Sequence, residues 1–195
     1  MKNWTGNKNS QFSTIGASNH SSRDREKNDY YATDPITIDS LLEVEKFNGT
    51  IWECACGEGH LSKRLKDKGL SVISTDIIDR GYCDDIIDFL KVDKKLGDNI
   101  ITNPPYRYAQ DFVEKSLELI EEGYKVAMFL KLTFLEGQRR NPMFKKYPPK
   151  NVYVFSKRQI CVINGDFENI KSSAVAYAWY VWEKGFDGKP QLSWI

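Results

Sequence analysis

The tetrapeptide Asn103–Tyr106 (NPPY) combines groups that can hold a small polar substrate still: an amide, two rigid prolines and an aromatic ring. It follows an apolar run with the pattern of a strand. Neither proline can donate to a sheet ladder, so the strand has to end there. One interpretation is a plain turn, because Asn-Pro commonly opens turns. The other is a rigid rim on which an amide oxygen and a backbone carbonyl are fixed for chemistry.

A glycine-rich turn, Glu53–Gly59 (ECACGEG), stands earlier in the chain between an apolar run and an amphipathic one. Glycines between a strand and a helix let the backbone turn sharply and approach a ligand closely. The alternative is a simple tight turn, because Ser62 occupies the position of the third glycine in the dinucleotide-binding fingerprint. The turn therefore indicates a ligand only together with other groups.

Acidic residues follow at two later strand ends. Asp76 closes the segment SVISTD, at about the separation from the glycines at which an acid meets ribose hydroxyls in nucleoside-binding α/β folds. Asp88, after a short third strand, offers an acceptor for an exocyclic amine, and Phe89 beside it offers an apolar surface. Each acid alone also fits a helix cap or a surface position. Together with the glycine turn, they predict a nucleoside pocket beside the NPPY rim.

Alternating strands and helices would position these groups. Asp34-Pro35 has the residues of a helix start, and this helix is predicted to run to about Phe47. From Thr50 onward the alternation predicts an α/β, Rossmann-like fold: a mostly parallel sheet with helices on both faces and an antiparallel pair of strands at the C-terminal edge. Ligands of such sheets bind at the carboxyl ends of the strands, where the glycine turn, the acids and NPPY all fall. The predicted elements are helices in HLSKRLKDKG and AQDFVEKSLELIEEG and strands in GTIWEC, LSVISTDI, DNIITN, YKVAMFLKL, NVYVFS and SAVAYAWYVWEK.

The composition indicates a flexible, basic N-terminal arm over residues 1–28 and a single domain over residues 29–195. The net charge of +1 excludes attraction of nucleic acid by the whole molecule, so only a local basic patch could bind it. The absence of a signal-peptide core, the cysteine usage and the lack of a long apolar run predict a soluble, cytoplasmic protein. We predict no metal, because Cys54-Ala-Cys56 lacks the spacing and the second cysteine pair of a zinc site.

The order of these motifs resembles that of class I S-adenosylmethionine-dependent methyltransferases. The segments DYYATDP, ECACGEG, STD, DFL and NPPY stand in the order of gamma-type DNA adenine-N6 methyltransferases, and the likeness extends from about Asn28 to the C-terminus. The arm and DYYATDP are also similar to small adenine methyltransferases of phages and prophages. The resemblance implies the class I methyltransferase fold and methyl transfer from S-adenosylmethionine to the N6 amine of a flipped adenine in DNA. We expect no separate target-recognition domain, for which this chain has no room.

The resemblance also implies roles for particular residues. Asn103 Oδ1 and the Pro104 carbonyl would accept the two N–H groups of the amine, which localises the nitrogen lone pair toward the methyl group. Pro105 would keep the rim rigid, and Tyr106 would stack on the extruded base. The cofactor would be held by Tyr31, Thr33, Pro35, Glu53, Ala55, Cys56, Gly57, Gly59, Asp76, Ile77, Asp88 and Phe89.

A basic stretch between Glu136 and Asp166 favours nucleic acid as the acceptor, because it contains no acid and interleaves basic with aromatic residues. The alternative is a solvated basic loop. RNA adenine and the side-chain amide of protein glutamine stay open as acceptors, because NPPY alone does not define the acceptor, and so does a non-catalytic cofactor-binding module. The residues predicted to contact DNA are Arg139, Arg140, Lys145, Lys146 and Arg158.

Overall fold

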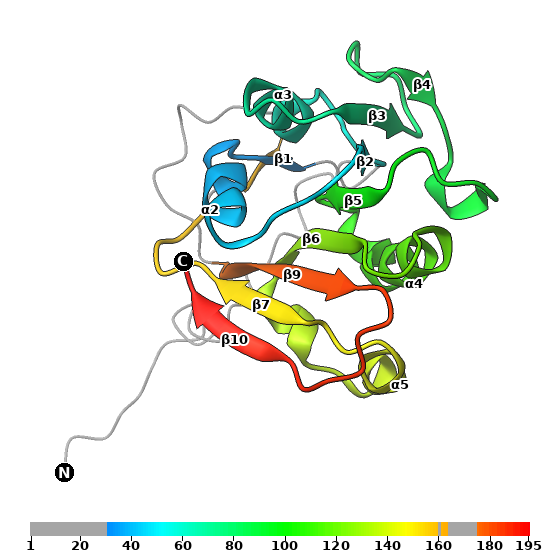
Figure 1. The fold of residues 1–195 in the computed structure, drawn as a ribbon. Helices are drawn as coiled ribbons and strands as arrows, with labels where there is room; N and C mark the ends of the chain where they lie inside the picture. The colour runs from blue at the N-terminus through cyan, green and yellow to red at the C-terminus, as the bar shows by residue number, and fades with distance from the viewer. Residues whose placement is uncertain (1–30, 160, 164–174) are drawn as a thin grey trace, which may run out of the picture.

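The structure, a computed structural model, describes residues 31–159, 161–163 and 175–195. The predicted N-terminal arm, residues 1–28, lies outside the described residues. An eight-stranded sheet forms the centre (Figure 1). Its strands are, in spatial order, β10 (Gln191–Trp194), β7 (Asn151–Val154), β9 (Tyr177–Glu183), β6 (Lys125–Lys131), β5 (Asn99–Thr102), β2 (Ile51–Glu53), β3 (Val72–Asp76) and β4 (Asp85–Ile86).

Most neighbouring strands of this sheet are parallel. β2 pairs in parallel with β3 and β5, β5 with β6, and β3 with β4. β9 is antiparallel to both β6 and β7. These pairings confirm the predicted mixed sheet and the antiparallel pairing of the two aromatic-rich strands. The outermost strand on that side, β10, was not predicted, because its four residues are all exposed and lack the apolar pattern of a buried strand.

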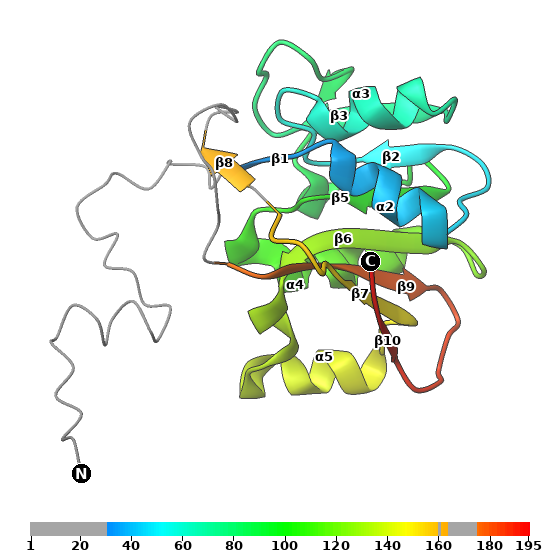
Figure 2. The ribbon, with the colours of Figure 1, turned by 90° about the vertical axis from the view of Figure 1, so that its left-hand side faces the viewer.

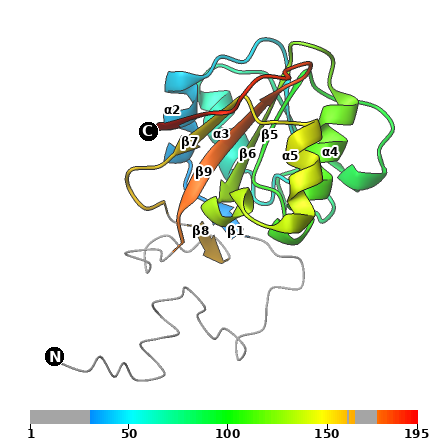
Figure 3. The same cartoon turned by 90° about the horizontal axis from the view of Figure 1, so that it is seen from below.

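Helices cover both faces of the sheet, as predicted. The predicted helix at Asp34-Pro35 begins where Asp34 Oδ1 accepts the Ile36 N–H at 3.0 Å, but it ends at Val44, short of Phe47. The two faces are seen best from below (Figure 3). One face carries α2 (Ile36–Val44) and α3 (His60–Asp67), and the other carries α4 (Ala109–Leu119) and α5 (Asn141–Lys146).

The core lies in two layers, one on each side of the sheet. Along β6, Met128 packs in the layer that contains Phe112 of α4, whereas Phe129 packs in the layer that contains Leu41 of α2. A central strand covered on both faces has apolar residues at successive positions, which explains the nearly continuous apolar run of β6. The buried indole of Trp52 adds a polar link, because its Nε1–H donates to Thr75 Oγ1 at 2.9 Å and ties β2 to β3.

A second, two-stranded sheet lies to one side of the main sheet (Figure 2). It consists of β1 (Tyr31–Thr33) and β8 (Cys161–Ile163), which are antiparallel, with Thr33 opposite Cys161. None of the helices in the described part of the chain is long and apolar enough to cross a membrane. The 3-10 turns, all at or near the carboxyl ends of strands, are η1 (Phe89–Lys91), η2 (Tyr106–Tyr108), η3 (Leu132–Leu135) and η4 (Gln138–Arg140).

Candidate active site

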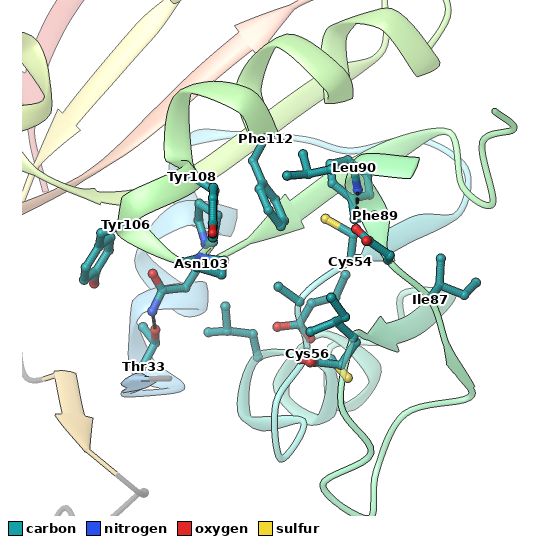
Figure 4. Close-up of a pocket in the computed structure, with 18 of the residues that line it drawn as sticks. Thr33, Cys54, Cys56, Ile87, Phe89, Leu90, Asn103, Tyr106, Tyr108 and Phe112 are labelled. Atoms are coloured by element: carbon teal, nitrogen blue, oxygen red, sulfur yellow. Dashed lines mark hydrogen bonds between the residues drawn. The ribbon is translucent and has the colours of Figure 1, made fainter. Parts of the chain in front are cut away.

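A cavity of about 910 Å³ lies at the carboxyl ends of β2, β3, β5 and β6, next to β1 (Figure 4). This is the edge at which parallel α/β sheets bind their ligands. Pro35, Gly57 and Gly59 do not line it, and the side chain of Tyr31 is outside the described part of the chain. The predicted residues that do line it are Thr33, Glu53, Ala55, Cys56, Asp76, Ile77, Asp88, Phe89, Asn103, Pro104, Pro105 and Tyr106.

The glycine turn is held in place by Asp76. Its carboxylate accepts the Gly57 N–H at 2.8 Å and the Ile78 N–H at 3.0 Å, and only 9% of the residue is exposed. Gly59 has a φ of +78°, and a Cβ there would lie 2.1 Å from the Tyr82 ring. Gly57 and Gly59 therefore shape the turn without lining the cavity, since their contribution is a backbone conformation that other residues rarely adopt.

Glu53, at the end of β2, is 2% exposed and belongs to a small polar cluster. The Ser62 hydroxyl contacts both Glu53 Oε2 and, at 2.7 Å, Ser74 Oγ. Burial raises the pKa of the Glu53 carboxyl to about 8, and the negative charge of Asp76 acts in the same direction. Ser62, which stands where a dinucleotide-binding turn has its third glycine, thus supplies a hydrogen-bond partner for a buried carboxyl group.

Glu53 should make the stability of the protein depend on pH. Its pKa rises from 4.5 in the unfolded chain to about 8 in the folded one, so the folded state holds a proton that the unfolded state releases. The free energy of unfolding should therefore fall as the pH rises through this window, by up to about 1.4 kcal/mol per pH unit from this group. Glu53→Gln stays neutral and should lose this part of the slope. Urea denaturation of both proteins across the window measures it, and equal slopes would contradict the assignment.

Asp88 and Phe89 line the cavity at the start of η1. Asp88 Oδ1 accepts the Leu90 N–H at 3.2 Å, and its Oδ2 pairs at 2.7 Å with Lys91, whose side chain is 83% exposed. Phe89 is 2% exposed and packs edge-on against Trp52, with ring centroids 5.1 Å apart. The structure thus gives Asp88 a capping role and Phe89 a core role in addition to their places on the cavity wall.

Asn103 stands directly after β5, on the cavity wall. Its Nδ2 donates to Thr33 Oγ1 at 2.7 Å, and the amide oxygen points away from Thr33 (Figure 4). The prolines then end the strand, and the Pro105 carbonyl accepts the Tyr108 N–H at 2.9 Å, which begins the 3-10 turn η2. The NPPY motif therefore forms both a turn and a fixed part of the cavity wall.

Tyr106 lies in a more crowded environment than the sequence indicated. Lys131 Nζ lies 4.6 Å from the centre of its ring, and the Tyr177 ring centre lies 6.2 Å away. Tyr108, two positions later, also lines the cavity and is 43% exposed. The wall beside Asn103 thus presents two tyrosine rings, of which only Tyr106 was predicted from the sequence.

The basic residues that line the cavity differ from those predicted to contact DNA. Arg80, Lys91, Arg107 and Lys131 line it, whereas none of the predicted DNA-contacting residues does. Signals in the sequence could have identified two of these cavity residues, Arg107 and Lys131. Arg107 directly follows NPPY, and Lys131 ends a strand whose carboxyl end faces the ligand edge. Arg139, Lys145, Lys146 and Arg158 are exposed outside the cavity.

Arg140, one of the predicted DNA contacts, is held by its own loop. Its guanidinium donates to the carbonyls of Phe134 at 2.8 Å, Glu136 at 2.5 Å and Thr133 at 3.3 Å. It also lies over the Phe134 ring, 4.9 Å from the ring centre. This side chain fixes the connection from η3 to η4, so the structure gives it a stabilising contact independent of any ligand.

Replacing Arg140 with alanine should lower the free energy of unfolding by about 1–3 kcal/mol, because the loop loses charged hydrogen bonds to its carbonyls. Arg139→Ala, at the exposed neighbouring position, is the matched control and should change it by less than about 0.5 kcal/mol. Urea denaturation of the two variants measures the difference. Equal stabilities would show that the carbonyl contacts of Arg140 do not support the fold.

Two cysteines of the glycine turn face the same region. Burial raises the pKa of the Cys54 and Cys56 thiols above its ordinary value, so both are neutral and present small, weakly polar surfaces to the cavity. Both cysteines, and Cys83, are free thiols. Among the described residues, no group of three or more His, Cys, Asp or Glu side chains is arranged to hold a metal ion.

No protein-family model and no curated protein sequence matches the chain. Solved structures do match. A Listeria monocytogenes protein assigned as a class I S-adenosylmethionine-dependent methyltransferase is 17% identical, with a TM-score of 0.55 over 95% of this chain and 71% of its own. The modification subunit assigned to a type I restriction enzyme of Vibrio vulnificus is 12% identical, with a TM-score of 0.58 over 96% of this chain and 50% of its own.

A third match is a Pyrococcus horikoshii protein assigned as an RNA methyltransferase, 14% identical, with a TM-score of 0.50 over 77% of this chain and 81% of its own. The chain thus spans half the length of the Vibrio subunit and larger shares of the other two. At these identities the likeness concerns the fold. The chain has the Rossmann-like fold of class I methyltransferases, as the order of its motifs predicted.

Proposed function

We propose that the protein transfers the methyl group of S-adenosylmethionine to the N6 amine of adenine in DNA. The observation that carries this proposal is that Asn103 and the acidic residue Asp76 line one cavity, at the ligand-binding edge of a class I methyltransferase fold. The amide of Asn103 suits an amine acceptor, and the carboxylate of Asp76 suits the hydroxyls of a ribose. An intact NPPY rim on this cavity argues against a non-catalytic binding module.

The residues present fit the cofactor. The cavity volume of about 910 Å³ lies within the usual range for small-molecule sites. Asp76 would accept ribose hydroxyls, and Asp88 would accept the adenine amine after its exposed partner Lys91 moves aside. The turn around Ala55 and Cys56 would meet the methionine part. When bound, the cofactor supplies an electrophilic methyl group on a positively charged sulfur.

The rim would activate the acceptor by hydrogen bonding. The N6 lone pair of adenine is delocalised into the ring, which makes the amine a poor nucleophile. Asn103 Oδ1 and the Pro104 carbonyl would accept its two N–H groups and hold the nitrogen nearer to tetrahedral geometry, with its lone pair turned toward the methyl group. In the transfer, the methyl group would leave the sulfur as it bonds to the amine nitrogen, and the surplus proton of the amine would pass to solvent.

The charges around the rim favour a nucleic acid over a protein acceptor. Arg107 and Lys131 flank Tyr106 on the wall that carries Asn103. Basic side chains beside aromatic rings suit an extruded nucleotide, because the cations attract phosphate and the rings accept a base. Arg139, exposed after η3, would extend this basic surface toward a DNA duplex.

A transfer assay with three acceptors tests the proposal. The protein is incubated with methyl-labelled S-adenosylmethionine and, separately, duplex DNA, single-stranded RNA and a glutamine-containing protein mixture. We expect label in DNA. Label in RNA alone, or in protein alone, would show that this molecule and not DNA is the acceptor. Cofactor binding with no label in any acceptor would instead identify a binding module.

A further inference from the structure

The hydrogen bond between Thr33 and Asn103 joins two parts of the chain that lie 70 residues apart. Thr33 belongs to β1, is 3% exposed and lines the cavity, and Asn103 follows β5 on the same wall. The Asn103 Nδ2–H donates to Thr33 Oγ1 at 2.7 Å (Figure 4). A hydroxyl of the small sheet thus contacts the amide of the rim directly.

This contact shows which end of the amide is turned toward Thr33. The oxygen and the nitrogen of an asparagine side chain have nearly the same size, and their orientation is set by their hydrogen-bond partners. With Nδ2 turned to Thr33, Oδ1 is turned away from it. In the flipped orientation the NH₂ group would face an acceptor amine, and two donors would oppose each other. The flipped amide could not accept an N–H group.

We propose that Thr33 is a positioning residue for methyl transfer: its hydroxyl holds the Asn103 amide with the oxygen toward the acceptor amine. This inference rests on the proposed function and differs from the cofactor contact that the motif resemblance implies for Thr33. A positioning role predicts an effect on the transfer step, whereas a cofactor contact predicts an effect on cofactor affinity. The two roles are therefore separable by measurement.

The backbone around Thr33 is well fixed, as a positioning residue requires. Thr33 is paired with Cys161 in the small sheet. Directly after it, the Asp34 carbonyl accepts the Thr37 N–H at 3.0 Å and the Thr37 hydroxyl at 2.8 Å, which anchors the start of α2. The hydroxyl of Thr33 is thus presented from a segment that is held on both sides.

Thr33→Val tests this role, because it keeps the shape of the side chain and removes the hydroxyl. We expect the single-turnover rate of methyl transfer to fall by about tenfold to hundredfold, while the dissociation constant of S-adenosylmethionine changes by less than about twofold. Thr33→Ser, which keeps the hydroxyl, should recover the rate to within about threefold of the wild type. Rates come from rapid-quench assays at saturating cofactor and affinities from calorimetry.

Thr37→Val is the matched control. It removes the hydroxyl of a second buried threonine close in sequence, one that donates to the Asp34 carbonyl instead of accepting from Asn103. This variant should lower the stability by about 1 kcal/mol and leave the rate within about twofold of the wild type. Circular dichroism melts of all variants establish that each is folded at the assay temperature.

Three results would overturn the proposal: an unchanged rate in Thr33→Val, a loss of cofactor affinity large enough to account for the loss of rate, or equal impairment of Thr33→Val and Thr33→Ser. These results differ from a failure of the proposed function. If the wild type methylates RNA or protein in place of DNA, the same comparison is made with that acceptor. A wild type that methylates none of the three contradicts the proposed function and the role of Thr33 together.

Discussion

Replacing Asn103 with alanine should lower the rate of methyl transfer by about 10²–10³-fold, the loss typical when a charge-stabilising hydrogen-bond group is removed from an active site. The side chain lines the cavity, and it is the nitrogen of its amide, not the oxygen, that is bound to Thr33. Without it, the Pro104 carbonyl alone would hold the amine. The nitrogen lone pair would then stay delocalised into the base.

Cofactor affinity should distinguish this loss from general damage. Asn103→Ala should bind S-adenosylmethionine within about threefold of the wild type, because the predicted cofactor contacts come from other strand ends. Gln110→Ala, on α4 just beyond the rim, is the control, since the Gln110 side chain donates to Glu114 at 3.1 Å at the surface and does not line the cavity. If Asn103→Ala kept the wild-type rate, the Asn103 side chain would have no part in methyl transfer.

Replacing Asp76 with alanine should weaken the binding of S-adenosylmethionine by about 100-fold or more. The substitution removes an acceptor for the ribose hydroxyls, and hydrogen bonds to charged groups contribute about 1.5–3 kcal/mol. It also leaves the N–H groups of Gly57 and Ile78 without their carboxylate partner, which loosens the glycine turn. Titration calorimetry measures the affinity directly.

Asp79→Ala is the control for this second prediction. Asp79 accepts the Gly81 N–H at 2.7 Å in the next turn, but it is exposed and does not line the cavity. Its removal should change the affinity by less than about twofold. If Asp76→Ala and Asp79→Ala bind the cofactor equally well, Asp76 serves only to hold the turn and the nucleoside pocket is wrongly placed.

The main sheet was predictable because its central strands are buried on both faces. The apolar run of β6 and the aromatic run of β9, in a chain with alternating helices, indicate a sheet covered on both faces. The strands that were not predicted, β1, β8 and β10, are each only three or four residues long, too short for a periodicity to be recognised. The helix α5, six residues long, was not predicted for the same reason.

The candidate site was predictable to the extent that its residues stand at strand ends. Glu53, Asp76 and Asn103 each follow a recognisable strand, and the parallel sheet brings them to one edge. The contact between Thr33 and Asn103 depends on how the small sheet sits beside β5, which no local pattern encodes. Arg140 shows another limit: its charge is plain in the sequence, but its hydrogen bonds to the carbonyls of its own loop are not.

The most direct test of the central claim is analysis of the nucleosides of duplex DNA after incubation with the protein and S-adenosylmethionine that carries a deuterated methyl group. We expect deuterated N6-methyladenine with the wild type, and only background amounts with Asn103→Ala. A deuterated methyl group on a different nucleoside, none on any, or equal N6-methyladenine from the two proteins would contradict the proposed role of the rim.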